Sequence, residues 1–431
     1  MENSLAQSKR NCPLQVAVIG GGAAGFFGAI ACAEADSKVQ VTLFEAGRSP
    51  LTKVRISGGG RCNVTHHCFD PALLAQHYPR GGRALRGPLS RFQPQDTVAW
   101  FKRRGVTLKT EADGRMFPVT DDSATIVNCL QHTARTLGVQ VKTRAAIAAV
   151  KAVPDGFQLQ FKGGGKGFCH RLLLATGSHP SGYKLAQALG HTLIEPVPSL
   201  FTFNIPEPAL HQLAGIAFDP AELKLTLPGE MPLSQTGPLL VTHWGLSGPA
   251  VLKLSAWGAR ALHKARYRGT LTINWLPDLN LEQIRAALMQ AKQDWLKRSL
   301  SSHCPLPLPK RFWQYQLHRA DIPPDLTWGN ASKKAISRLA QSLSQATYPI
   351  SGKGVFKEEF VTCGGVNLRE VNFKTLESRC CPGLYFAGEI LDIDGVTGGF
   401  NFQSAWTTGW LAGQAIAQPL AVQKTVSGRA G

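Results

Sequence analysis

The sequence predicts an α/β fold of the doubly wound type, with a second domain inserted into the chain. Two observations predict the α/β fold. An apolar strand, a glycine-rich turn and a helix of small residues follow one another near the start, and a similar order closes the chain. A third observation, the different composition of the long middle stretch, predicts the inserted domain.

The first apolar run, residues 16–19, reads VAVI and is typical of a strand buried on both faces. Gly20, Gly22 and Gly25 follow it in G-x-G-x-x-G spacing, and residues 23–35 predict a helix without proline. This order is that of a dinucleotide-binding unit. In such a unit Gly20 permits the tight turn, Gly22 lets a pyrophosphate approach the backbone, and Gly25 lets the helix pack on the strand.

A second buried strand is predicted over residues 39–44, and Glu45 stands at its carboxyl end, 20 residues after Gly25. An acid at this spacing can accept hydrogen bonds from an adenosine ribose, while the free N–H groups at the helix start hold phosphates. The alternative is a glycine-rich turn in an unrelated α/β sheet. We interpret the unit as nucleotide-binding because strand, turn, helix and acid are all present.

The composition is that of a globular protein, with 43% hydrophobic and 8% aromatic residues among 431. This length allows two or three domains. No apolar run reaches the ~20 residues of a membrane-spanning helix. The first dozen residues are polar and do not resemble a secretory signal, so we expect a cytoplasmic protein.

The ten cysteines occur without C-x-x-C pairs or metal-type spacing, which favours reduced thiols and predicts no metal site. The adjacent Cys380 and Cys381 are interpreted as two free thiols. Cys62 has no partner at C-x-x-x-x-C spacing, and Cys68 is a poor match, so a catalytic disulfide is not expected.

The chain carries 47 Lys and Arg against 28 Asp and Glu, a net charge of +19. Two stretches hold much of the excess: residues 48–109 have 12 basic and 2 acidic residues, and residues 253–319 have 12 basic and 3 acidic residues. Such stretches attract an anionic cofactor or substrate, RNA or a membrane surface. The alternative is an ordinary solvated basic face.

A glycine-rich block, SGGGRCNVT, spans residues 57–65. Three consecutive glycines are too costly for a helix interior, but they let the backbone lie flat against a planar ligand or take positive φ angles. Lys53, Arg55 and Arg61 flank the glycines and suit a phosphate or a negatively charged ring, and Asn63 offers a neutral donor and acceptor. The alternative is a flexible loop.

The next elements are predicted from capping residues and strand patterns. A helix is expected over residues 94–104, a hairpin over residues 106–119, and a second helix from Asp122 or Ser123 to Leu137. The remaining elements before residue 178 are short strands, over residues 139–142, 146–152, 157–162 and 167–175, with a turn at residues 163–167.

From about residue 178 the composition changes, and strand-like pieces punctuated by Pro and Gly run to about residue 275, with residues 238–255 among them. A helical, basic section follows, in which the tryptophans are expected to pack the core. Extended sequence resumes over residues 354–366. A segment inserted between two parts of one sheet explains this order. The helices of the basic section are expected over residues 281–300, 309–319 and 331–346.

The chain closes with another strand and glycine-rich turn. Residues 384–387 predict a buried strand that Gly388 and Glu389 end, and a helix of small and aromatic residues begins at Gly398 and Gly399. A helix N-terminus beside glycine is a natural anion site. We expect it to face the first glycine-rich turn.

Six blocks of the chain, read together, form a pattern: VAVIGGGAAG, KVRISGGGRCNVT, DGRMFPV, LLLATG, LLVTHWGLSGPAVL and GGVNLREVNFKTLESRCCPGLYFAGEILDIDGVTGGFNFQSAWTTG. They resemble the BaiN-like (YhiN-like) family of FAD-dependent, NAD(P)H-linked oxidoreductases, within the glutathione-reductase-like flavoproteins. The resemblance covers about residues 16–413. The SGGGRCN block and the closing block are its specific parts.

The resemblance implies an α/β fold with a Rossmann-like FAD-binding domain and an inserted β-barrel plus a small helical domain. On this chain it implies that the FAD-binding domain covers residues 14–190 and 361–418. The β-barrel is then expected over residues 191–275 and 347–360, and the helical domain over residues 276–346.

The resemblance also implies FAD in an extended form and NAD(P)H as a transient co-substrate. The helix near Gly399 is expected to stabilise negative charge on the reduced flavin. The implied contacts are Gly20, Gly22, Ala23, Ala24, Gly25, Glu45 and Ala46 for the pyrophosphate and ribose; Lys53, Ser57, Gly58, Gly59, Gly60, Arg61, Cys62 and Asn63 along the flavin; Thr176 and Gly177 on the adenosine side; Gly388 and Glu389 near the ribityl chain or pyrophosphate; and Gly398, Gly399, Phe400, Asn401, Phe402 and Gln403 at the isoalloxazine ring.

The chain departs from the family pattern in three places. The loop ATGSHPSGYK is shorter than the expected glycine- and serine-rich loop, so the FAD or substrate edge differs. His66 stands where an Asn is expected. The second glycine-rich NAD(P) domain of disulfide reductases is missing, so a nicotinamide donor is expected to dock directly against the flavin.

Three functions follow from these observations. The first is an FAD-dependent oxidoreductase that passes hydride from NAD(P)H through flavin N5 to a small-molecule acceptor, such as an activated carbon–carbon double bond. His243 is its candidate proton donor, with a structural histidine as the alternative. The second is an RNA-associated, tRNA-modifying flavoprotein, which the basic stretches favour. The third is an FAD-binding protein without turnover.

Overall fold

The computed structural model describes residues 13–354 and 361–418. The chain divides into two compact units. The first unit is formed by the chain up to Pro196 and again from Gly364 onward, and the inserted unit is Val197–Cys363. In the part of the chain that is described, no helix is both long and apolar enough to cross a membrane.

The first unit is built on a sheet whose described strands have the order β20-β21-β22-β10-β1-β2-β6. The strands from β22 to β6 run parallel, and β20 and β21 add an antiparallel edge. Strand β1 lies between β2 and β10, so the chain order reverses there, where a doubly wound sheet binds its ligand. The strands are β1 (Gln15–Ile19), β2 (Gln40–Phe44), β6 (Gln140–Lys142), β10 (Arg171–Leu174), β20 (Val371–Asn372), β21 (Glu377–Ser378) and β22 (Leu384–Phe386).

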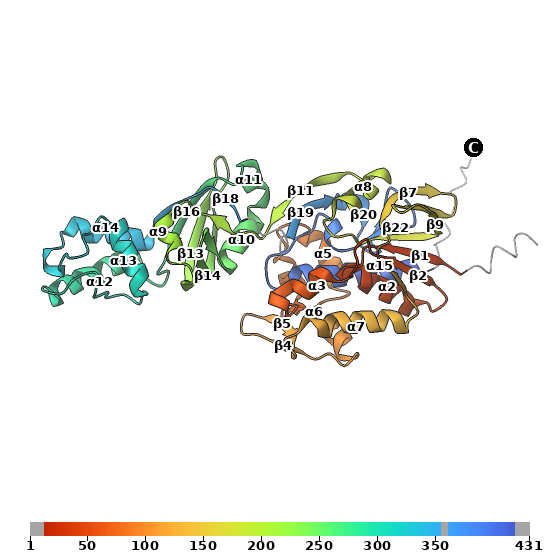
Figure 1. Cartoon of the computed structure of the whole chain (residues 1–431), viewed down its shortest axis with the longest axis horizontal. Helices are drawn as coiled ribbons and strands as arrows, with labels where there is room; N and C mark the ends of the chain where they lie inside the picture. The colour runs from red at the N-terminus through yellow and green to blue at the C-terminus, as the bar shows by residue number, and fades with distance from the viewer. Residues whose placement is uncertain (1–12, 355–360, 419–431) are drawn as a thin grey trace, which may run out of the picture. The chain divides into compact units, whose positions relative to one another are not determined.

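Two helices that follow glycine-rich turns, α2 (Ala23–Ala35) and α15 (Phe400–Ala417), pack against each other beside this sheet (Figure 1). Glycines line their contact. A Cβ atom on Gly409 would lie 2.7 Å from the carbonyl oxygen of Ala24, and one on Gly413 would lie 2.4 Å from that of Gly28. The order of these contacts shows that the two helices run in the same direction.

The other elements of the first unit surround this pair and the sheet. Two small antiparallel sheets, β3-β5-β4 and β7-β8-β9, lie outside the main sheet. These elements are α3 (Thr52–Ile56), η1 (Ser57–Gly60), β3 (Thr65–His66), α4 (Pro71–Ala75), α5 (Gly82–Leu89), α6 (Pro94–Lys102), β4 (Leu108–Thr110), β5 (Arg115–Pro118), α7 (Ser123–Thr136), β7 (Ile147–Val153), β8 (Gly156–Phe161), β9 (Lys166–Cys169), α8 (Pro180–Ala188), η3 (Leu368–Glu370) and η4 (Gly388–Ile390).

The inserted unit contains an antiparallel sheet of order β17-β16-β13-β14-β15-β12-β18. Its outermost strands, β17 and β18, are separated only by Ser351, whose N–H donates to the carbonyl of Asn204 at 3.0 Å. One stretch of chain therefore pairs with both ends of the sheet, which curls into a barrel. The strands are β12 (Phe203–Asn204), β13 (Ala217–Thr226), β14 (Leu233–Thr242), β15 (Gly245–Ser247), β16 (Gly269–Asn274), β17 (Ala346–Ile350) and β18 (Gly352–Lys353).

The helices of the inserted unit share one apolar core with the barrel. Trp275, which follows β16, packs against Phe312 of α13 with ring centroids 4.7 Å apart. Trp313 and Trp328 are buried, as expected. The α/β fold with an inserted barrel and helices confirms the predicted fold class. The helices are α9 (Pro208–His211), α10 (Pro249–Trp257), α11 (Ala259–Lys264), α12 (Leu281–Asp294), α13 (Lys310–Arg319), η2 (Trp328–Asn330) and α14 (Lys333–Ser344).

The chain passes between the units in strands β11 (Leu193–Ser199) and β19 (Val361–Val366), which pair with each other. The extended prediction for residues 354–366 falls on β19 only in part, because residues 355–360 lie outside the described residues. The pairing of β11 with β19 brings the two ends of the inserted unit together.

Three sequence predictions of local structure were wrong. Residues 238–255 were expected to be extended, but α10 begins at Pro249 because Gly248, at φ +97°, ends the strand and proline favours the first helical position. The strand expected over residues 167–175 is two strands, β9 and β10, in different sheets. The helix expected over residues 281–300 ends at Asp294.

Candidate functional site

The predicted site residues gather at one edge of the parallel sheet, where its strands end. Gly20 follows β1, Glu45 follows β2, and Thr176 and Gly388 lie two residues beyond the ends of β10 and β22. Parallel strands end at the same edge, so the fold brings these four residues together. The approach is close, because a Cβ atom on Gly20 would lie 2.3 Å from the carbonyl oxygen of Ala175.

The turn between β1 and α2 leaves the start of the helix open. Gly22 is the N-cap of α2 and provides no side-chain cap, and no atom lies within 4 Å of the position of a Cβ atom there. A Cβ atom on Gly25 would lie 1.9 Å from the carbonyl oxygen of Gly20, so helix and turn pack tightly. The first N–H groups of α2 and its positive dipole end are therefore open to an anionic group.

Glu45 is fixed beside this turn by backbone donors. Its Oε2 atom accepts from the N–H of Gly21 at 2.8 Å, and its Oε1 atom accepts from the N–H of Gly47 at 2.6 Å. Each carboxylate oxygen accepts two hydrogen bonds, so one acceptor position on each is left for a further donor.

Within the block 57–60, the three glycines form a run of left-handed backbone. The φ angles are +58° at Gly58, +68° at Gly59 and +86° at Gly60, which glycine adopts without steric cost; Cys62 is also left-handed, at +62°. A Cβ atom on Gly58 would lie 3.0 Å from the ring of Phe117, whereas no atom lies within 4 Å of the corresponding positions on Gly59 and Gly60. One side of the loop packs on the protein, and the other presents bare backbone to open space.

Asn63 joins this loop to the start of α15. In the amide orientation that satisfies both groups, its side chain donates to the carbonyl of Thr65 and accepts from the N–H of Gly399, each at 3.0 Å. Gly399 is the N-cap of α15 and, at φ +93°, provides no side-chain cap. The two most specific sequence blocks are therefore hydrogen-bonded neighbours, although more than 300 residues separate them.

The side chains that open α15 are engaged in packing. The ring of Phe400 stacks on His66 and His77, and the ring of Phe402 stacks on Trp406. Asn401 makes two hydrogen bonds with the backbone of Gly395. The predicted ligand contact of this segment therefore falls to the backbone of the glycine-rich turn.

Gln403 also holds α15 in place. It is completely buried, and its Oε1 atom accepts from the hydroxyls of Thr65 at 2.6 Å and Thr97 at 2.9 Å. Its Nε2 atom donates to Thr407. These bonds tie the first turns of α15 to β3 and α6.

Two charged residues of the predicted set form an ion pair. The Nζ atom of Lys53, in α3, lies 2.7 Å from the Oε2 atom of Glu389, in η4. Gly177 is next to this pair, since a Cβ atom there would lie 3.5 Å from the same oxygen. Arg61 instead pairs with Glu111 at 2.7 Å and covers the ring of Phe117.

Thr176 places a hydroxyl where the strand order reverses. Its Oγ1 atom is buried and has no hydrogen-bond partner among the described residues. The hydroxyl packs on α8, since a Cβ atom on Gly182 would lie 1.7 Å from it, so at this position only the backbone is offered to a ligand. Ala46 is exposed beside Glu45 and adds only backbone.

Cys62 is completely buried. Burial raises the pKa of its thiol to about 12. The neutral thiol is a poor nucleophile, so the structure agrees with the expectation that Cys62 forms no catalytic disulfide.

His243 does not lie with these residues in the first unit. It belongs to the inserted unit, where it is exposed in the turn between β14 and β15. The structure therefore adds no geometric support to its candidate role as a proton donor.

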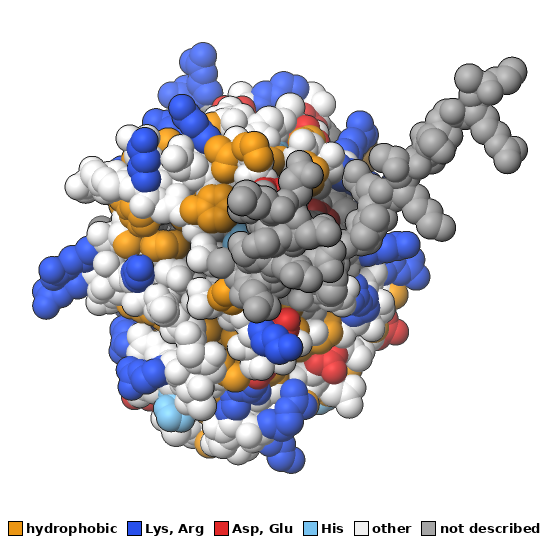
Figure 2. Space-filling model, turned by 90° about the vertical axis from the view of Figure 1, so that its right-hand side faces the viewer, with side chains coloured by type: hydrophobic (Ala, Val, Ile, Leu, Met, Phe, Trp, Pro, Cys, Tyr) orange, Lys and Arg blue, Asp and Glu red, His pale blue; other side chains and the backbone are white. Residues whose placement is uncertain are grey.

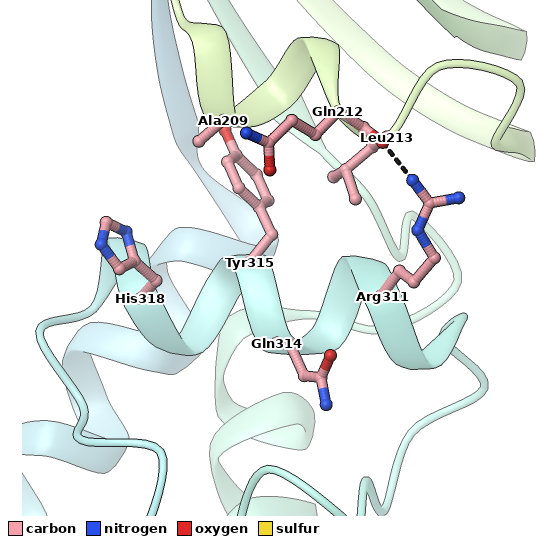
Figure 3. Close-up of a pocket in the computed structure, with 7 residues that line it drawn as sticks. All are labelled: Ala209, Gln212, Leu213, Arg311, Gln314, Tyr315 and His318. Carbon is pink, nitrogen blue, oxygen red and sulfur yellow. Dashed lines mark hydrogen bonds between the residues drawn. The ribbon is translucent and has the colours of Figure 1, made fainter.

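A pocket of about 370 Å³ lies in the inserted unit between α9 and α13 (Figure 3). Arg311 reaches across it to the carbonyl of Gln212, as the dashed line in Figure 3 shows. None of the predicted site residues lines this pocket. Its walls are formed by Ala209, Gln212, Leu213, Arg311, Gln314, Tyr315 and His318.

A second polar cluster in the first unit is internally satisfied. His191, Glu370 and Cys380 bring possible metal ligands within 4.8 Å of one another. However, the ring nitrogens of His191 bond to Glu370 at 3.1 Å and to Ser378 at 2.8 Å. This network is explained by hydrogen bonding within the protein.

Sequence reasoning missed the ion pair between Arg80 and Asp394. Asp394 is fully buried, and the guanidinium of Arg80 makes a bidentate contact with it, with Nε 2.6 Å from Oδ1. The pair ties the start of α5 to the segment that leads into α15. The available signal was an acid within the otherwise apolar and glycine-rich run ILDIDGVTGG.

The parallel sheet, the open glycine-rich turn and the acid after β2 together define a Rossmann-like protein of the dinucleotide-binding type. The comparison with protein families agrees with this class. The chain belongs to the family described as HI0933-like protein Rossmann domain, whose model matches residues 14–415.

Two relatives cover nearly the whole chain. A 3-dehydro-bile acid delta(4,6)-reductase of Clostridium scindens is 29% identical over 94% of this chain and 99% of its own length. A ribosomal RNA dihydrouridine synthase of Escherichia coli is 31% identical over 92% of this chain and 96% of its own length. A solved 3-ketosteroid-delta4-(5alpha)-dehydrogenase of Rhodococcus jostii is 14% identical, with a TM-score of 0.49, and covers 96% of this chain and 99% of its own.

Proposed function

We propose that this chain is an FAD-dependent reductase that uses NAD(P)H to reduce a carbon–carbon double bond conjugated to a carbonyl group. The arrangement of α2 and α15 is the observation that carries the proposal. Gly409 lies opposite Ala24 and Gly413 opposite Gly28, so α15 begins roughly two turns, about 12 Å, beyond the start of α2. Two helix N-termini thus point the same way at the two ends of an extended site.

The described residues fit FAD. The open start of α2 suits the pyrophosphate, and Glu45 suits the adenosine ribose. The bare backbone at Gly59 and Gly60 suits a planar ring. When bound, FAD supplies the capacity to accept a hydride and pass it on.

The chain's own contribution is binding, orientation and charge stabilisation. The positive dipole end of α15, held in place by Asn63, favours negative charge on a ligand beside Gly399. The Lys53–Glu389 ion pair fixes α3 against η4. The start of α15 would therefore favour the reduced, negatively charged form of a ring bound beside it over the neutral form.

The names of the two relatives support the class of acceptor. One reduces a 3-dehydro bile acid, in which the double bonds are conjugated to an oxo group. The other forms dihydrouridine, which arises from uridine when a double bond conjugated to a carbonyl is saturated. Both reactions saturate a carbon–carbon double bond conjugated to a carbonyl group, and they differ in the molecule that contains this bond.

A second candidate narrows the acceptor to uridine in RNA. The net charge of +19 favours it, because a polyanion is attracted by a basic surface. Figure 2 shows Lys and Arg spread around one face of the molecule, with fewer Asp and Glu among them. A small acceptor does not require this excess.

An anaerobic titration with NADPH and then NADH, followed by flavin absorbance, tests the reductase. We expect purified protein to carry FAD and to lose its flavin absorbance within seconds to minutes of adding at least one of the two donors. Protein that cannot be loaded with FAD would contradict the cofactor assignment, and loaded protein that neither donor bleaches would contradict the choice of donor.

The reduced protein then distinguishes the acceptors. It is mixed anaerobically with a 3-oxo-Δ4 steroid or with a uridine-rich RNA, and the products are analysed by mass spectrometry. We expect flavin absorbance to return with one of them and that acceptor to gain two hydrogens. If neither acceptor restores the absorbance, the proposed acceptor class is wrong.

A further inference from the structure

We propose that the exposed face of α5, together with Arg91 and Lys374, binds the sugar–phosphate backbone of an RNA strand. This inference rests on the second candidate above, that the acceptor is uridine in RNA. We call these four residues, Arg83, Arg86, Arg91 and Lys374, the α5 stripe.

The structure divides the cations of the basic stretch 48–109 into paired and unpaired groups. Among the described residues, Arg83, Arg86 and Arg91 form no ion pair, since no carboxylate oxygen lies within 4.0 Å of their guanidinium groups. The charge excess seen in the sequence is therefore left partly on α5. Five other cations of the stretch are paired with acids: Lys53 with Glu389, Arg61 with Glu111, Arg80 with Asp394, Arg104 with Glu34 and Lys109 with Asp121.

The stripe has a regular geometry. Leu85 and Leu89 turn one face of α5 into the core, and Arg83 and Arg86 are exposed on the other. Residues three apart are neighbours on a helix, with Cβ atoms ~5–6 Å apart, so the two guanidinium groups can contact adjacent phosphates. Arg91 donates to the carbonyl of Lys374 at 2.6 Å, which places exposed Lys374 at the end of the stripe.

No acid opposes the three arginines of the stripe along the local chain. Residues 71–95 contain no Asp or Glu. The flanking acids are used in capping: Asp70 accepts from the backbone at the start of α4, and Asp96 accepts from the N–H of Gln93.

The stripe begins beside the candidate site. Gly81, the N-cap of α5, packs so closely on Ile393 that a Cβ atom there would lie 2.5 Å from it. Arg80 pairs with the buried Asp394. Both partners lie in the segment between η4 and α15, so a strand bound along α5 has a nucleotide within reach of that segment.

The outer face of α5 suits RNA better than a lipid surface. Ala84, Gly87 and Ser90 accompany the arginines there, and none of them is a large apolar side chain that would enter a bilayer. Arginine contacts phosphate with a planar, bidentate fork. The favoured partner is therefore a polyanionic strand.

The test uses the full-length, FAD-loaded protein and a fluorescein-labelled, uridine-rich single-stranded RNA. Binding is measured by anisotropy over a series of salt concentrations. The variant Arg83→Gln/Arg86→Gln/Lys374→Gln neutralises three cations of the stripe. A matched control, Lys151→Gln/Lys162→Gln/Lys166→Gln, removes the same charge from exposed lysines of the β7–β8–β9 region.

We expect the stripe variant to bind RNA about 100-fold more weakly at 0.1 M salt, and its log–log salt slope to fall by about 2. Each phosphate contact on a single strand releases about 0.7 counterions. The three neutralised cations therefore account for both the loss of affinity and the change in slope. We expect the control to bind within about threefold of the unmodified protein. FAD content and melting temperature show whether each variant is folded.

Four outcomes would overturn the inference. A stripe variant that binds RNA like the unmodified protein excludes the stripe and leaves the RNA acceptor standing. Equal losses in variant and control indicate a diffuse field instead of a site. A stripe variant that loses binding only to phosphatidylserine vesicles identifies a membrane surface. If the unmodified protein binds no RNA, the RNA acceptor fails as well, whereas bleaching by NADPH still tests the reductase separately.

Discussion

At the scale of single residues, backbone conformation explains more of the candidate site than side-chain chemistry does. Gly58, Gly59 and Gly60 all have positive φ angles, and the last two face open space. The side chains that follow Gly399 are occupied with packing, as Gln403 shows. What the site offers a ligand is therefore mainly backbone N–H groups and bare peptide surface.

Adding a methyl group at Gly59 tests this interpretation. Gly59→Ala should lower FAD affinity at least tenfold, because the new Cβ enters the space assigned to the ring, and should cost ~1–2 kcal/mol of stability through its left-handed backbone. Gly105→Ala is a matched control, since Gly105 has φ +77° and also no atom within 4 Å of a Cβ position. Isothermal titration with FAD and chemical denaturation measure both effects. Equal FAD affinity in the two variants would show that no ring lies at Gly59.

The titration of Cys62 gives a pH prediction. Burial raises the pKa of its thiol to about 12 in the folded protein, against 9.0 for a thiol exposed to water. As the pH rises, the unfolded chain therefore loses this proton before the folded protein does. Cys62 contributes fully to stability below the pKa of the unfolded chain. This contribution is lost as the pH rises toward the pKa of the folded protein.

We expect Cys62→Ala to show a shallower loss of stability than the unmodified protein when denaturation at about pH 8 and pH 10.5 is compared. In the native protein, alkylation at about pH 8 should modify exposed Cys380 and leave Cys62 intact. Peptide mass spectrometry measures the modification. Rapid labelling of Cys62 would contradict its assignment as a buried, inert thiol.

At the scale of elements, the contact of α2 with α15 positions the whole site. The two helices approach closely because Gly28, Gly409 and Gly413 carry no side chain at the contact. That approach sets how far α15 extends beyond the start of α2. Asn63 then fixes the glycine-rich loop to the N-terminus of α15.

A single methyl group should disturb this contact. Gly413→Ala places its Cβ 2.4 Å from the carbonyl oxygen of Gly28 and 2.8 Å from the Cβ of Ala31, so we expect ~1–3 kcal/mol of destabilisation and weaker FAD binding. Gly87→Ala, in α5, has nothing within 4 Å and should be neutral or stabilising by up to ~1 kcal/mol. Urea denaturation measures both. A Gly413→Ala protein as stable as the Gly87→Ala protein would mean that the helices can separate without cost.

At the scale of the whole molecule, all predicted cofactor contacts lie in the first unit. The inserted unit has its own closed sheet and its own core, which includes Trp275 and Phe312. Strands β11 and β19 pair where the chain leaves and re-enters the first unit, so removing the insertion leaves two chain ends that are already neighbours.

Replacing residues 200–360 with a short Gly/Ser linker should therefore yield a folded protein that binds FAD, because no predicted FAD contact is lost. We expect its FAD affinity to stay within about tenfold of that of the full chain. Far-ultraviolet circular dichroism and flavin absorbance measure folding and binding. A folded but colourless protein would show that the inserted unit contributes to the FAD site.

The sequence by itself determined the elements whose signals are local. Glycine spacing, the apolar runs of β1 and β2, and Glu45 predicted the nucleotide-binding unit, because turn geometry and strand burial constrain residue type at each position. The same rules failed at residues 238–255, where one left-handed glycine, Gly248, converts an apparent strand into a strand followed by a helix. Apolar residues alone do not distinguish the two.

Only the tertiary structure decided which segments meet. The hydrogen bond from Gly399 to Asn63 and the ion pair of Arg80 with Asp394 join residues far apart in the chain. Contacts of this kind also decide which arginines are paired with an acid and which are not. Sequence spacing carries no information on such contacts, because they depend on sheet order and on the glycine-lined approach of α2 and α15. Charge could be counted from the sequence, but which charges remain available to a partner was decided by the fold.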